Sequence, residues 1–473
     1  MSKVVTIEPC SRLEGHGKIT LHLDDEGKLD DAKFHVVEFR GFEKLMEGRK
    51  VWEAPRITPR SCGICPVSHH LASAKACDDL FGAQIPESAK LIRELMHMGQ
   101  FIHSHALHFF YLGAPDFFYP MDAAKRNILG VIGADPEMAK KAILLRKCGQ
   151  EIIHITGGKR IHPITALPGG VSKPISSKEK ELLDNYIKQA KELALELYPV
   201  AKQIFSDNKE LINSFAPVKT NYMGSINNAG NLQLYDGKLN VISPEGKDIV
   251  TFTYDKYLEN IGEKVATWSY MKFPFVKKIG WPDGMYRVGP LARLNVASNI
   301  STSIANNELM EFRKFFNSER IVNGTLQYHW ARLIELIHAI EKSEEILSNP
   351  ELLSKNVRVK VTPKAGEGVG IIEAPRGTLI HHYKADDKGT ITMCNLIVAT
   401  VGNNGGINMS VKEAAKQYVN ASRLEEPIMN MVEMAVRAYD PCLSCATHAI
   451  GKMPLNVSLF DKNNKLLDKK IKN

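Results

Sequence analysis

Two C-x-x-C pairs constrain this 473-residue chain more than any other feature, because they lie near its opposite ends. The first pair is Cys62 and Cys65, and the second is Cys442 and Cys445. A two-residue spacer lets both sulfurs of a pair face one metal, so two short loops can supply four thiolates. Such a site requires a fold that brings the C-terminal region back to a segment near the N-terminus.

The residues around both pairs favour metal binding. Gly63 permits a tight turn between the first two sulfurs. Pro66 suits the first position of a helix, where the positive partial charge at the helix start favours a thiolate at Cys65. Pro441 ends the preceding helix and holds the second loop in an open shape.

Three simpler explanations of the cysteine pairs stay open. A structural zinc site usually joins pairs that lie within tens of residues, whereas residues 66–441 separate these pairs. A thioredoxin-like redox pair would follow the first strand of a βαβ unit, and neither pair does. Chance is the last explanation. The residues alone therefore favour a four-cysteine metal site, with the metal undetermined.

Composition excludes several classes of protein. Eight cysteines are too few for a disulfide framework at this length, and the four outside the pairs suit buried apolar positions. The net charge of +8 is spread thinly and includes tail lysines, so we expect a solvated surface without a nucleic-acid site. No run reaches the roughly 18 apolar residues of a membrane span, and no signal-like segment starts the chain. We expect a cytoplasmic protein.

Periodicity predicts one domain of the α+β class with a large helical-bundle core. We expect β-rich residues 1–50, helical residues 51–219, a β-rich insert at 220–275, helical residues 276–356, a β-rich segment and helix at 357–448, and an extension at 449–473. The clearest helix starts at Ser176, which forms a capping box with Glu179. A single helix is expected at about Val411–Ala438, and a strand at Pro454–Phe460.

The full strings around the pairs are more specific than C-x-x-C. R-x-C-G-x-C at residues 60–65, with D-P-C-x-x-C-x-x-H at residues 440–448, resembles the signature pair of nickel-iron hydrogenase large subunits. Further segments match this family in order: R-L-E-G-H at 12–16, R-G-F-E at 40–43, G-G-K at 157–159, H-P at 162–163, P-G-G at 168–170 and E-A-P-R-G at 373–377. The strings are most similar to those of methanogen hydrogenases, and among these to the viologen-reducing type associated with heterodisulfide reductase.

This resemblance implies a dinuclear centre. Cys62 and Cys442 would be terminal nickel ligands, whereas Cys65 and Cys445 would bridge nickel and iron. The iron would carry carbon monoxide and cyanide ligands. The implied reaction is the heterolytic cleavage of H2 to protons and electrons. Cys442 would accept the proton first and Glu14 would relay it, although without the resemblance Glu14 is better explained as an exposed carboxylate at a strand end.

Further residues would surround the metals by the same resemblance. Arg376 would place a permanent positive charge over them, with Asp440 as its partner. His69 would donate a hydrogen bond to a bridging sulfur, that of Cys445, and Thr400 would hydrogen-bond a cyanide ligand. Taken alone, Arg376 fits a surface loop, and His69 fits a satisfied core histidine equally well.

A second metal is also implied by the resemblance. Glu43, the main-chain carbonyl of Leu396 and His448 match the family's magnesium or iron site. Many relatives lose the residues after this histidine when the metal site is completed. The 25 residues that follow here (449–473) have a strand-like pattern, so we expect the mature protein to keep them. Ser104 and Ala399 depart from the aspartate and proline that are common in the family, which predicts a less charged canopy.

Partners follow from the same resemblance. This chain has no further cysteine cluster, so electrons would pass to iron-sulfur clusters in a separate small subunit. From the small subunit, electrons would pass through an electron-transfer subunit to heterodisulfide reductase. The alternatives within the family are a hydrogen-sensing regulatory subunit, which usually lacks a C-terminal extension, and the quinone-reducing relatives, which have lost the nickel cysteines. A structural zinc protein remains the alternative outside it.

Overall fold

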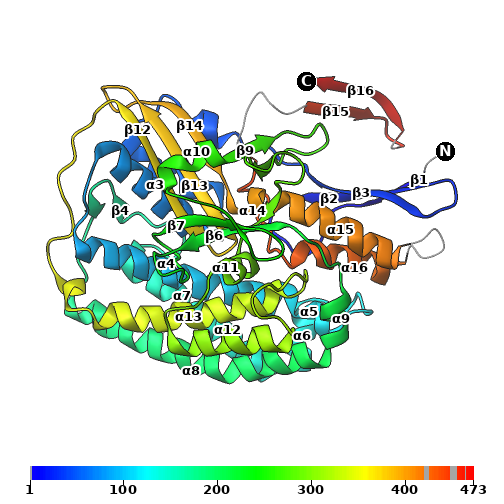
Figure 1. Cartoon of the computed structure of the whole chain (residues 1–473), viewed down its shortest axis with the longest axis horizontal. Coiled ribbons are helices and arrows are strands. Elements are labelled where there is room, and N and C mark those ends of the chain that lie inside the picture. Colours follow the sequence, from blue (N-terminus) through cyan, green and yellow to red (C-terminus); the bar gives the residue numbers. More distant parts are fainter. Residues whose placement is uncertain (1–2, 420–424, 448–454, 464, 473) are drawn as a thin grey trace.

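The computed structural model describes residues 3–419, 425–447, 455–463 and 465–472. The fold is α+β, as predicted: one side is a layer of long helices, and the sheets lie on the other side (Figure 1). Within the layer, α4 contacts α7 and α13, and α8 contacts α7 and α13. The layer comprises α4 (Glu87–Leu107), α7 (Pro136–Gly157), α8 (Ser177–Asp207), α12 (Ser303–Phe315) and α13 (Tyr328–Ser348).

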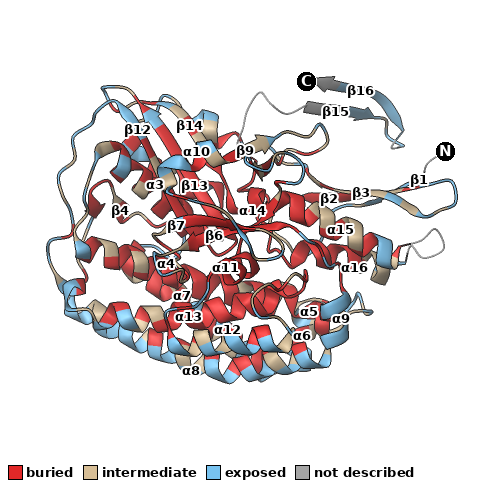
Figure 2. Ribbon diagram, in the orientation of Figure 1, coloured by how far each residue is buried: buried red, intermediate tan, exposed pale blue. Residues whose placement is uncertain are grey.

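Helix α8 shows how sequence determines this layer. Ser176 is its N-cap and forms the predicted capping box with Glu179. The apolar stripe of this helix is buried throughout: Leu183, Ile187, Ala190, Ala194 and Leu197. Figure 2 shows exposed and buried faces alternating along α8, whereas α4 and α13 are mostly buried. The helix predicted from Ser176 is therefore confirmed.

Helix α3 (Pro66–Phe81) lies against an antiparallel sheet of β12 (Gly366–Ala374), β13 (Gly377–Ala385) and β14 (Ile391–Ile397). The predicted helix start at Pro66 is confirmed. Glycines in β12 allow a close approach. A Cβ at Gly368 would lie 2.3 Å from the Ala76 carbonyl oxygen, and one at Gly370 would lie 2.0 Å from that of Ala72. Any larger residue at these positions would push the helix away from the sheet.

The remaining sheets are small. The N-terminal sheet is β1 (Lys3–Ile7), β2 (Gly17–Leu23) and β3 (Leu29–Val36), in that order. The predicted insert contains β6 (Asn221–Ile226), β7 (Lys238–Ile242), β8 (Asp248–Phe252), and the pair β9 (Ile261–Lys264) and β10 (Phe273–Val276). Strand β11 (Tyr286–Arg287) follows the insert in sequence and pairs with β6 in parallel. Strands β4 (Ala166–Leu167) and β5 (Gly170–Val171) form a short hairpin.

Short helices connect these layers. They are α1 (Phe42–Met46), α2 (Ala54–Ile57), α5 (Pro115–Phe118), α6 (Ile128–Ala134), α9 (Lys209–Ser214), α10 (Tyr257–Asn260), α11 (Pro290–Val296) and α14 (Ala399–Gly402). A 3-10 turn at Thr58–Ser61 leads directly into the first cysteine pair.

The prediction of a single helix at Val411–Ala438 is wrong. The segment contains the end of α15 (Asn404–Tyr418) and all of α16 (Glu426–Arg437), which pack against each other. Pro427 lies in the first turn of α16. Proline lacks an N–H group and clashes with the preceding turn, so it is tolerated at a helix start and disrupts a helix interior.

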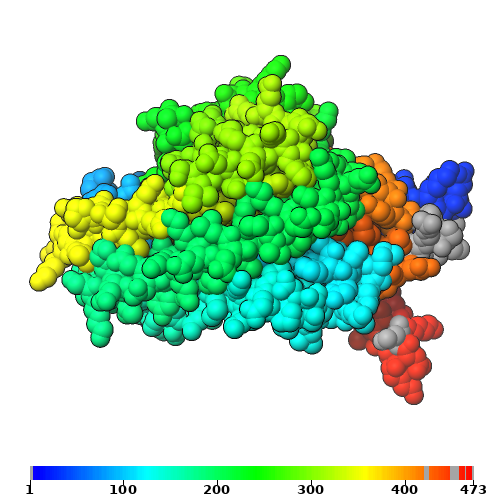
Figure 3. All heavy atoms as spheres, turned by 90° about the horizontal axis from the view of Figure 1, so that it is seen from below, coloured from blue at the N-terminus to red at the C-terminus, as the bar shows by residue number. Residues whose placement is uncertain are grey.

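The C-terminal segment forms a hairpin of β15 (Leu455–Phe460) and β16 (Leu466–Lys472), so the predicted strand is present. Pro454, its predicted first residue, lies outside the described residues. Figure 3 shows this hairpin projecting from the body of the protein. Among the residues that the structure describes, no helix has the length and apolar character that crossing a membrane requires.

Candidate metal centre

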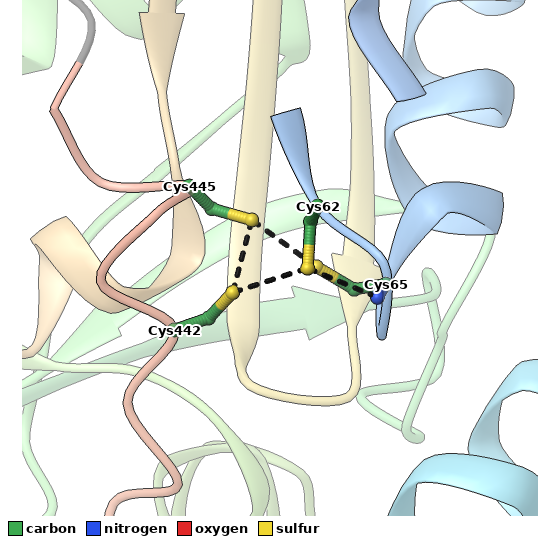
Figure 4. A group of neighbouring side chains, drawn as sticks. All are labelled: Cys62, Cys65, Cys442 and Cys445. Carbon is green, nitrogen blue, oxygen red and sulfur yellow. Dashed lines mark hydrogen bonds between the residues drawn. The ribbon is translucent and has the colours of Figure 1, made fainter. Parts of the chain in front are cut away.

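The four paired cysteines converge at one buried point (Figure 4). The sulfur of Cys62 lies 3.2 Å from that of Cys442, and the sulfur of Cys65 lies 3.4 Å from that of Cys445. Cys442 and Cys445 are 3.0 Å apart, and all four sulfurs lie within 4.8 Å of one another. Sulfurs that share one tetrahedral metal with bonds of about 2.3 Å would be roughly 3.8 Å apart. The spacing therefore fits thiolates gathered around metal ions.

The first loop presents its backbone to a sulfur. The N–H groups of Ile64 and Cys65 donate to the sulfur of Cys62 at 3.2 and 3.3 Å. Cys65 is the N-cap of α3, as its position before Pro66 predicts. Gly63 is not in the left-handed region, and no atom would contact a Cβ there. Gly63 thus permits the turn, as predicted, but neither its backbone conformation nor a close contact requires a glycine at this position.

The second loop is docked onto the N-terminal segment. Leu443 N–H donates to the carbonyl oxygen of Glu14 at 3.0 Å, and Glu14 forms an isolated β-bridge with Cys442. Gly15 has a φ of 84°, and a Cβ there would lie 2.8 Å from the Cβ of Leu443. Glycine is required here for both reasons. This contact fixes the second cysteine pair against the segment that carries Glu14.

The electrostatics of the site favour a bound cation. Burial raises the pKa of Cys442 and that of Cys445. The pKa of Cys65 is lowered by contacts with the other three thiols, that with Cys442 having the largest effect. Several buried thiolates without a counter-ion would be costly. The donor set therefore fits soft transition metals, which bind thiolates.

Arg376 lies beside these sulfurs with its predicted partner. Its Nε donates to the carbonyl oxygen of Asp440 at 2.7 Å, and its Nη2 lies 3.0 Å from Oδ1 of Asp440. Burial alone lowers the pKa of Arg376, but the Asp440 carboxylate and the cysteine sulfurs raise it above its usual value. Nη1 of Arg376 has no hydrogen-bond partner among the described residues. It can therefore donate to a group bound in the site.

A small pocket of about 10 Å³ adjoins the sulfurs. Thr400 lines it, and the hydroxyl oxygen of Thr400 accepts a hydrogen bond from Cys442 N–H at 3.0 Å. Ala399, one of the two departures from the family pattern, also lines this pocket. The lining residues are Cys65, Ser68, His69, Ala374, Arg376, Leu379, Val398, Ala399, Thr400, Cys442 and Cys445.

His69 lies on α3 and lines the same pocket as Cys65 and Cys445. Its Nδ1 lies 3.1 Å from Nε2 of His381. Its Nε2 is buried without a hydrogen-bond partner among the described residues. The sequence indicated His69 from its distance of four residues after Cys65, but it gave no sign that His381 lies behind it.

Glu14 connects the sulfurs to the surface. Its Oε2 lies 3.1 Å from the sulfur of Cys442 and accepts a hydrogen bond from Ser444 N–H, also at 3.1 Å. Ser444 Oγ lies 3.4 Å from Oε2 of Glu38, and Glu38 is paired with the exposed His16. The hydrogen bond that His16 donates to the Glu38 carboxylate raises the pKa of His16. The sequence analysis missed Glu38, although a carboxylate just before the R-G-F-E string was a usable signal.

The predicted second metal site is only partly within the described residues. Oε1 of Glu43 accepts a hydrogen bond from the main-chain N–H of Leu396 at 2.9 Å, so these two predicted ligands are adjacent. The prediction used the carbonyl of Leu396 instead. His448 lies outside the described residues. The carbonyl of the preceding Thr447 accepts from the N–H of Arg40 at 3.0 Å, three residues before Glu43.

Comparison with known proteins identifies the class. The model of a family described as nickel-dependent hydrogenase matches residues 40–141 and 208–448, and a model described as HoxL-like matches residues 4–39. The chain belongs to the nickel-dependent hydrogenase family and is a hydrogenase large subunit, as the motifs predicted.

Similar proteins include two types of hydrogenase. The chain is 46% identical to one of the subunits of F420-non-reducing hydrogenase vhc of Methanococcus voltae, covering 96% of this chain and 97% of that protein. It is 42% identical to NAD-reducing hydrogenase HoxS subunit beta of Cupriavidus necator, and the match covers 99% of this chain and 100% of that protein. A crystal structure of an NAD+-reducing [NiFe]-hydrogenase in the H2-reduced state has a TM-score of 0.91 at 44% identity, covering 94% of this chain and 99% of that one. The family is thus established, whereas the methanogen subtype is not distinguished.

Proposed function

We propose that this chain is the single-domain catalytic subunit of a nickel-iron hydrogenase of the viologen-reducing type, which passes electrons from H2 through a partner small subunit to heterodisulfide reductase. One observation carries the catalytic part of the proposal. Four buried cysteine sulfurs lie within 4.8 Å of one another, beside a buried arginine and a carboxylate that leads to the surface. A structural zinc site requires neither of these two additions.

Each cysteine has a role in this proposal. Cys62 and Cys442 would hold nickel, and Cys65 and Cys445 would hold both nickel and the iron, which would carry carbon monoxide and cyanide. When bound, this centre supplies the Lewis acidity that polarises H2 and lets it split heterolytically. Burial of all four residues keeps water from competing for the metals.

The proton leaves through the chain's own residues. The sulfur of Cys442 holds it first and passes it to Oε2 of Glu14, 3.1 Å away. The next carboxylate is Glu38, which contacts Ser444, and its partner His16 is exposed to solvent. This order leads from the sulfur, through two carboxylates that both contact Ser444, to a histidine at the surface.

Other residues shape the pocket. Arg376 keeps a positive charge over the metals, because a guanidinium does not lose its proton in proteins. Asp440 holds that side chain in place at 3.0 Å. The Thr400 hydroxyl accepts from Cys442 N–H and retains its own hydrogen to donate to a cyanide ligand. We assign His69 as a hydrogen-bond donor to a bridging sulfur.

A magnesium or iron ion occupies a second site in this proposal. Glu43, the Leu396 carbonyl and His448 would bind it together with water. The adjacency of Glu43 and Leu396 supports the assignment. Three protein ligands with water complete an octahedral site for a hard cation.

The electron partners are inferred from chemistry and similarity. Within the described residues, the only group of three or more possible metal ligands is the four-cysteine group, so electron transfer away from the site needs an iron-sulfur small subunit. Similarity to F420-non-reducing hydrogenase subunits of methanogens supports a methanogen-type hydrogenase. We assign the viologen-reducing type, with an electron-transfer subunit and heterodisulfide reductase as partners, from the resemblance of the sequence motifs alone. We place the complex in the cytoplasm.

Infrared spectroscopy of the native complex, with metal analysis, tests the catalytic proposal. We expect bands of metal-bound carbon monoxide and cyanide, with about one nickel per chain. Zinc without such bands would contradict it. The acceptor is tested on the same sample by identifying the co-purified subunits and comparing H2-dependent reduction of a heterodisulfide with that of NAD+. Reduction of NAD+ alone would overturn the proposed partner and leave the catalytic site intact.

A further inference from the structure

Behind the metal centre, four buried polar side chains follow one another in a line. Nδ1 of His69 lies 3.1 Å from Nε2 of His381, and Nδ1 of His381 lies 2.6 Å from the hydroxyl of Tyr383. That hydroxyl donates to Oγ of Ser73 at 2.9 Å. His69 is 1% exposed, and the other three residues are fully buried. We call this line the histidine ladder.

The spacing of the ladder follows from secondary structure. His69 and Ser73 are four residues apart on α3 and share one face of the helix, about 6 Å apart along its axis. His381 and Tyr383 are two residues apart on β13 and share one face of the strand, about 6.7 Å apart. The two intervals nearly match, so both pairs can meet when the helix lies along the sheet.

A glycine brings the helix close enough. Gly370 is the register partner of His381 on the neighbouring strand β12. A Cβ at Gly370 would lie 2.0 Å from the carbonyl oxygen of Ala72, one residue before Ser73. A side chain at Gly370 would therefore separate α3 from β13 and break the ladder.

The ladder assigns a role to each ring nitrogen. Three of the four nitrogens have partners within it, and only Nε2 of His69 has none among the described residues. A neutral imidazole carries only one N–H. The choice of the protonated nitrogen in His381 therefore determines which nitrogen of His69 is protonated. When the Tyr383 hydroxyl donates to His381, the Nε2–H of His381 points to His69, and the hydrogen of His69 must be on its Nε2.

From this geometry we infer that His381 and Tyr383 are positioning residues, which hold His69 so that its Nε2–H donates to a cysteine thiolate of the metal centre. The inference rests on the proposed nickel-iron site, because metal-bound thiolates can only accept. In the structure, Tyr383 donates to Ser73. A hydroxyl hydrogen rotates to suit its neighbours, so Tyr383 can donate to His381 from the same position.

A competing explanation is that the ladder only satisfies buried polar groups. The neighbouring residue on β13 offers a matched control. His382 Nδ1 lies 2.8 Å from the hydroxyl of Tyr257, and both side chains are buried. Successive residues of a strand point to opposite faces, so this pair is not part of the ladder. Tyr257→Phe removes the same kind of hydrogen bond without reaching His69.

The experiment compares Tyr383→Phe and Tyr257→Phe in the full complex by infrared spectroscopy. We expect Tyr383→Phe to retain its metals and to shift the carbon monoxide and cyanide bands, because a weaker donor leaves more electron density on the thiolate sulfurs. Tyr257→Phe should leave the bands at their wild-type positions. Unshifted bands in Tyr383→Phe, or equal shifts in both variants, would overturn the inference.

A double-mutant cycle separates coupling through His69 from a general disturbance. In a His69→Leu background, Tyr383→Phe should produce no further shift. An unchanged shift in that background would overturn the inference. If Tyr383→Phe does not load metals, Ser73→Ala replaces it in the same cycle, and a smaller shift of the infrared bands is expected. That shift should again be absent from Tyr257→Phe and should vanish in the His69→Leu background. Absence of the bands from the wild-type complex would refute the proposed metal centre, which is a distinct result.

Discussion

Replacing Glu14 tests the proton route most directly. Glu14→Gln keeps the size of the side chain and an oxygen that can accept from Ser444 N–H, but an amide cannot take up a proton from Cys442 at neutral pH. General acid–base groups contribute about 10²–10⁴-fold to rate. We therefore expect turnover to fall by this factor, which is about 3–5 kcal/mol of barrier.

Glu14→Asp tests the same route by distance. Oε2 of Glu14 lies 3.1 Å from the sulfur of Cys442. Aspartate is shorter by one carbon–carbon bond of about 1.5 Å, so its nearest oxygen would lie roughly 4.5 Å from the sulfur. That distance is too long for a direct hydrogen bond. The aspartate variant should therefore lose nearly as much turnover as the glutamine variant, although it keeps a carboxylate.

The assay is H2-dependent reduction of benzyl viologen by the full complex, with metal content and infrared bands measured on each sample. Both variants should keep wild-type metal content, because Glu14 is not one of the proposed metal ligands. Glu8→Gln is the control, since Glu8 is an exposed carboxylate near the start of the same segment. Wild-type turnover in a metal-loaded Glu14→Gln variant would refute the route through Glu14.

Three further substitutions test a buried ion pair elsewhere in the core and two residues near the metal centre. Arg293 lies 2.6 Å from the buried carboxylate of Glu335, and Arg293→Met leaves that carboxylate without this partner. The free energy of unfolding should therefore fall by about 3–5 kcal/mol, measured as a lower unfolding midpoint in urea. Although burial raises the pKa of Glu335, Arg293 lowers it to about 2, so the pair's stabilisation should be lost as pH falls toward that value. Glu38→Gln should lower the pKa of His16 toward its usual value in an NMR titration, because a neutral amide replaces the carboxylate that stabilises the protonated imidazole. The raised pKa of His16 favours the folded state at low pH, and this contribution is lost as pH rises through it. Thr400→Val removes the acceptor of a buried N–H and should shift the infrared bands without loss of nickel, whereas unchanged bands would contradict its place beside the metals.

Local patterns in the sequence predicted what depends on neighbouring residues. The capping box at Ser176 and the helix start at Pro66 are determined by contacts within a few positions, and both are present. The convergence of the cysteine pairs was predicted from chemistry, since four thiolates at this spacing suit one site. The pairing of Arg376 with Asp440 depended on recognising the family, because 64 positions separate them.

What the sequence did not predict depends on tertiary contacts. Apolar periodicity continues through Pro427, which concealed the break before α16. Glu38 joins the proton route only because β3 brings the residues after it beside the second cysteine loop. His381 looked like an ordinary strand histidine, and its position behind His69 depends on how closely α3 approaches the sheet at Gly370.

Buried ion pairs join the second cysteine loop to the N-terminal segment without using any of the proposed metal ligands. Arg437, three residues before Asp440, bonds to Asp116 at 2.9 Å, and Asp116 also pairs with Arg12, two residues before Glu14. Arg437 and Asp116 are both buried, so breaking their contact would leave a charge unpaired in the interior. These charged groups therefore help to fix how the second cysteine loop lies against the segment that carries Glu14. In a small structural zinc domain, by contrast, the metal itself can hold the binding loops together. Here buried protein contacts hold the second cysteine loop against the N-terminal segment.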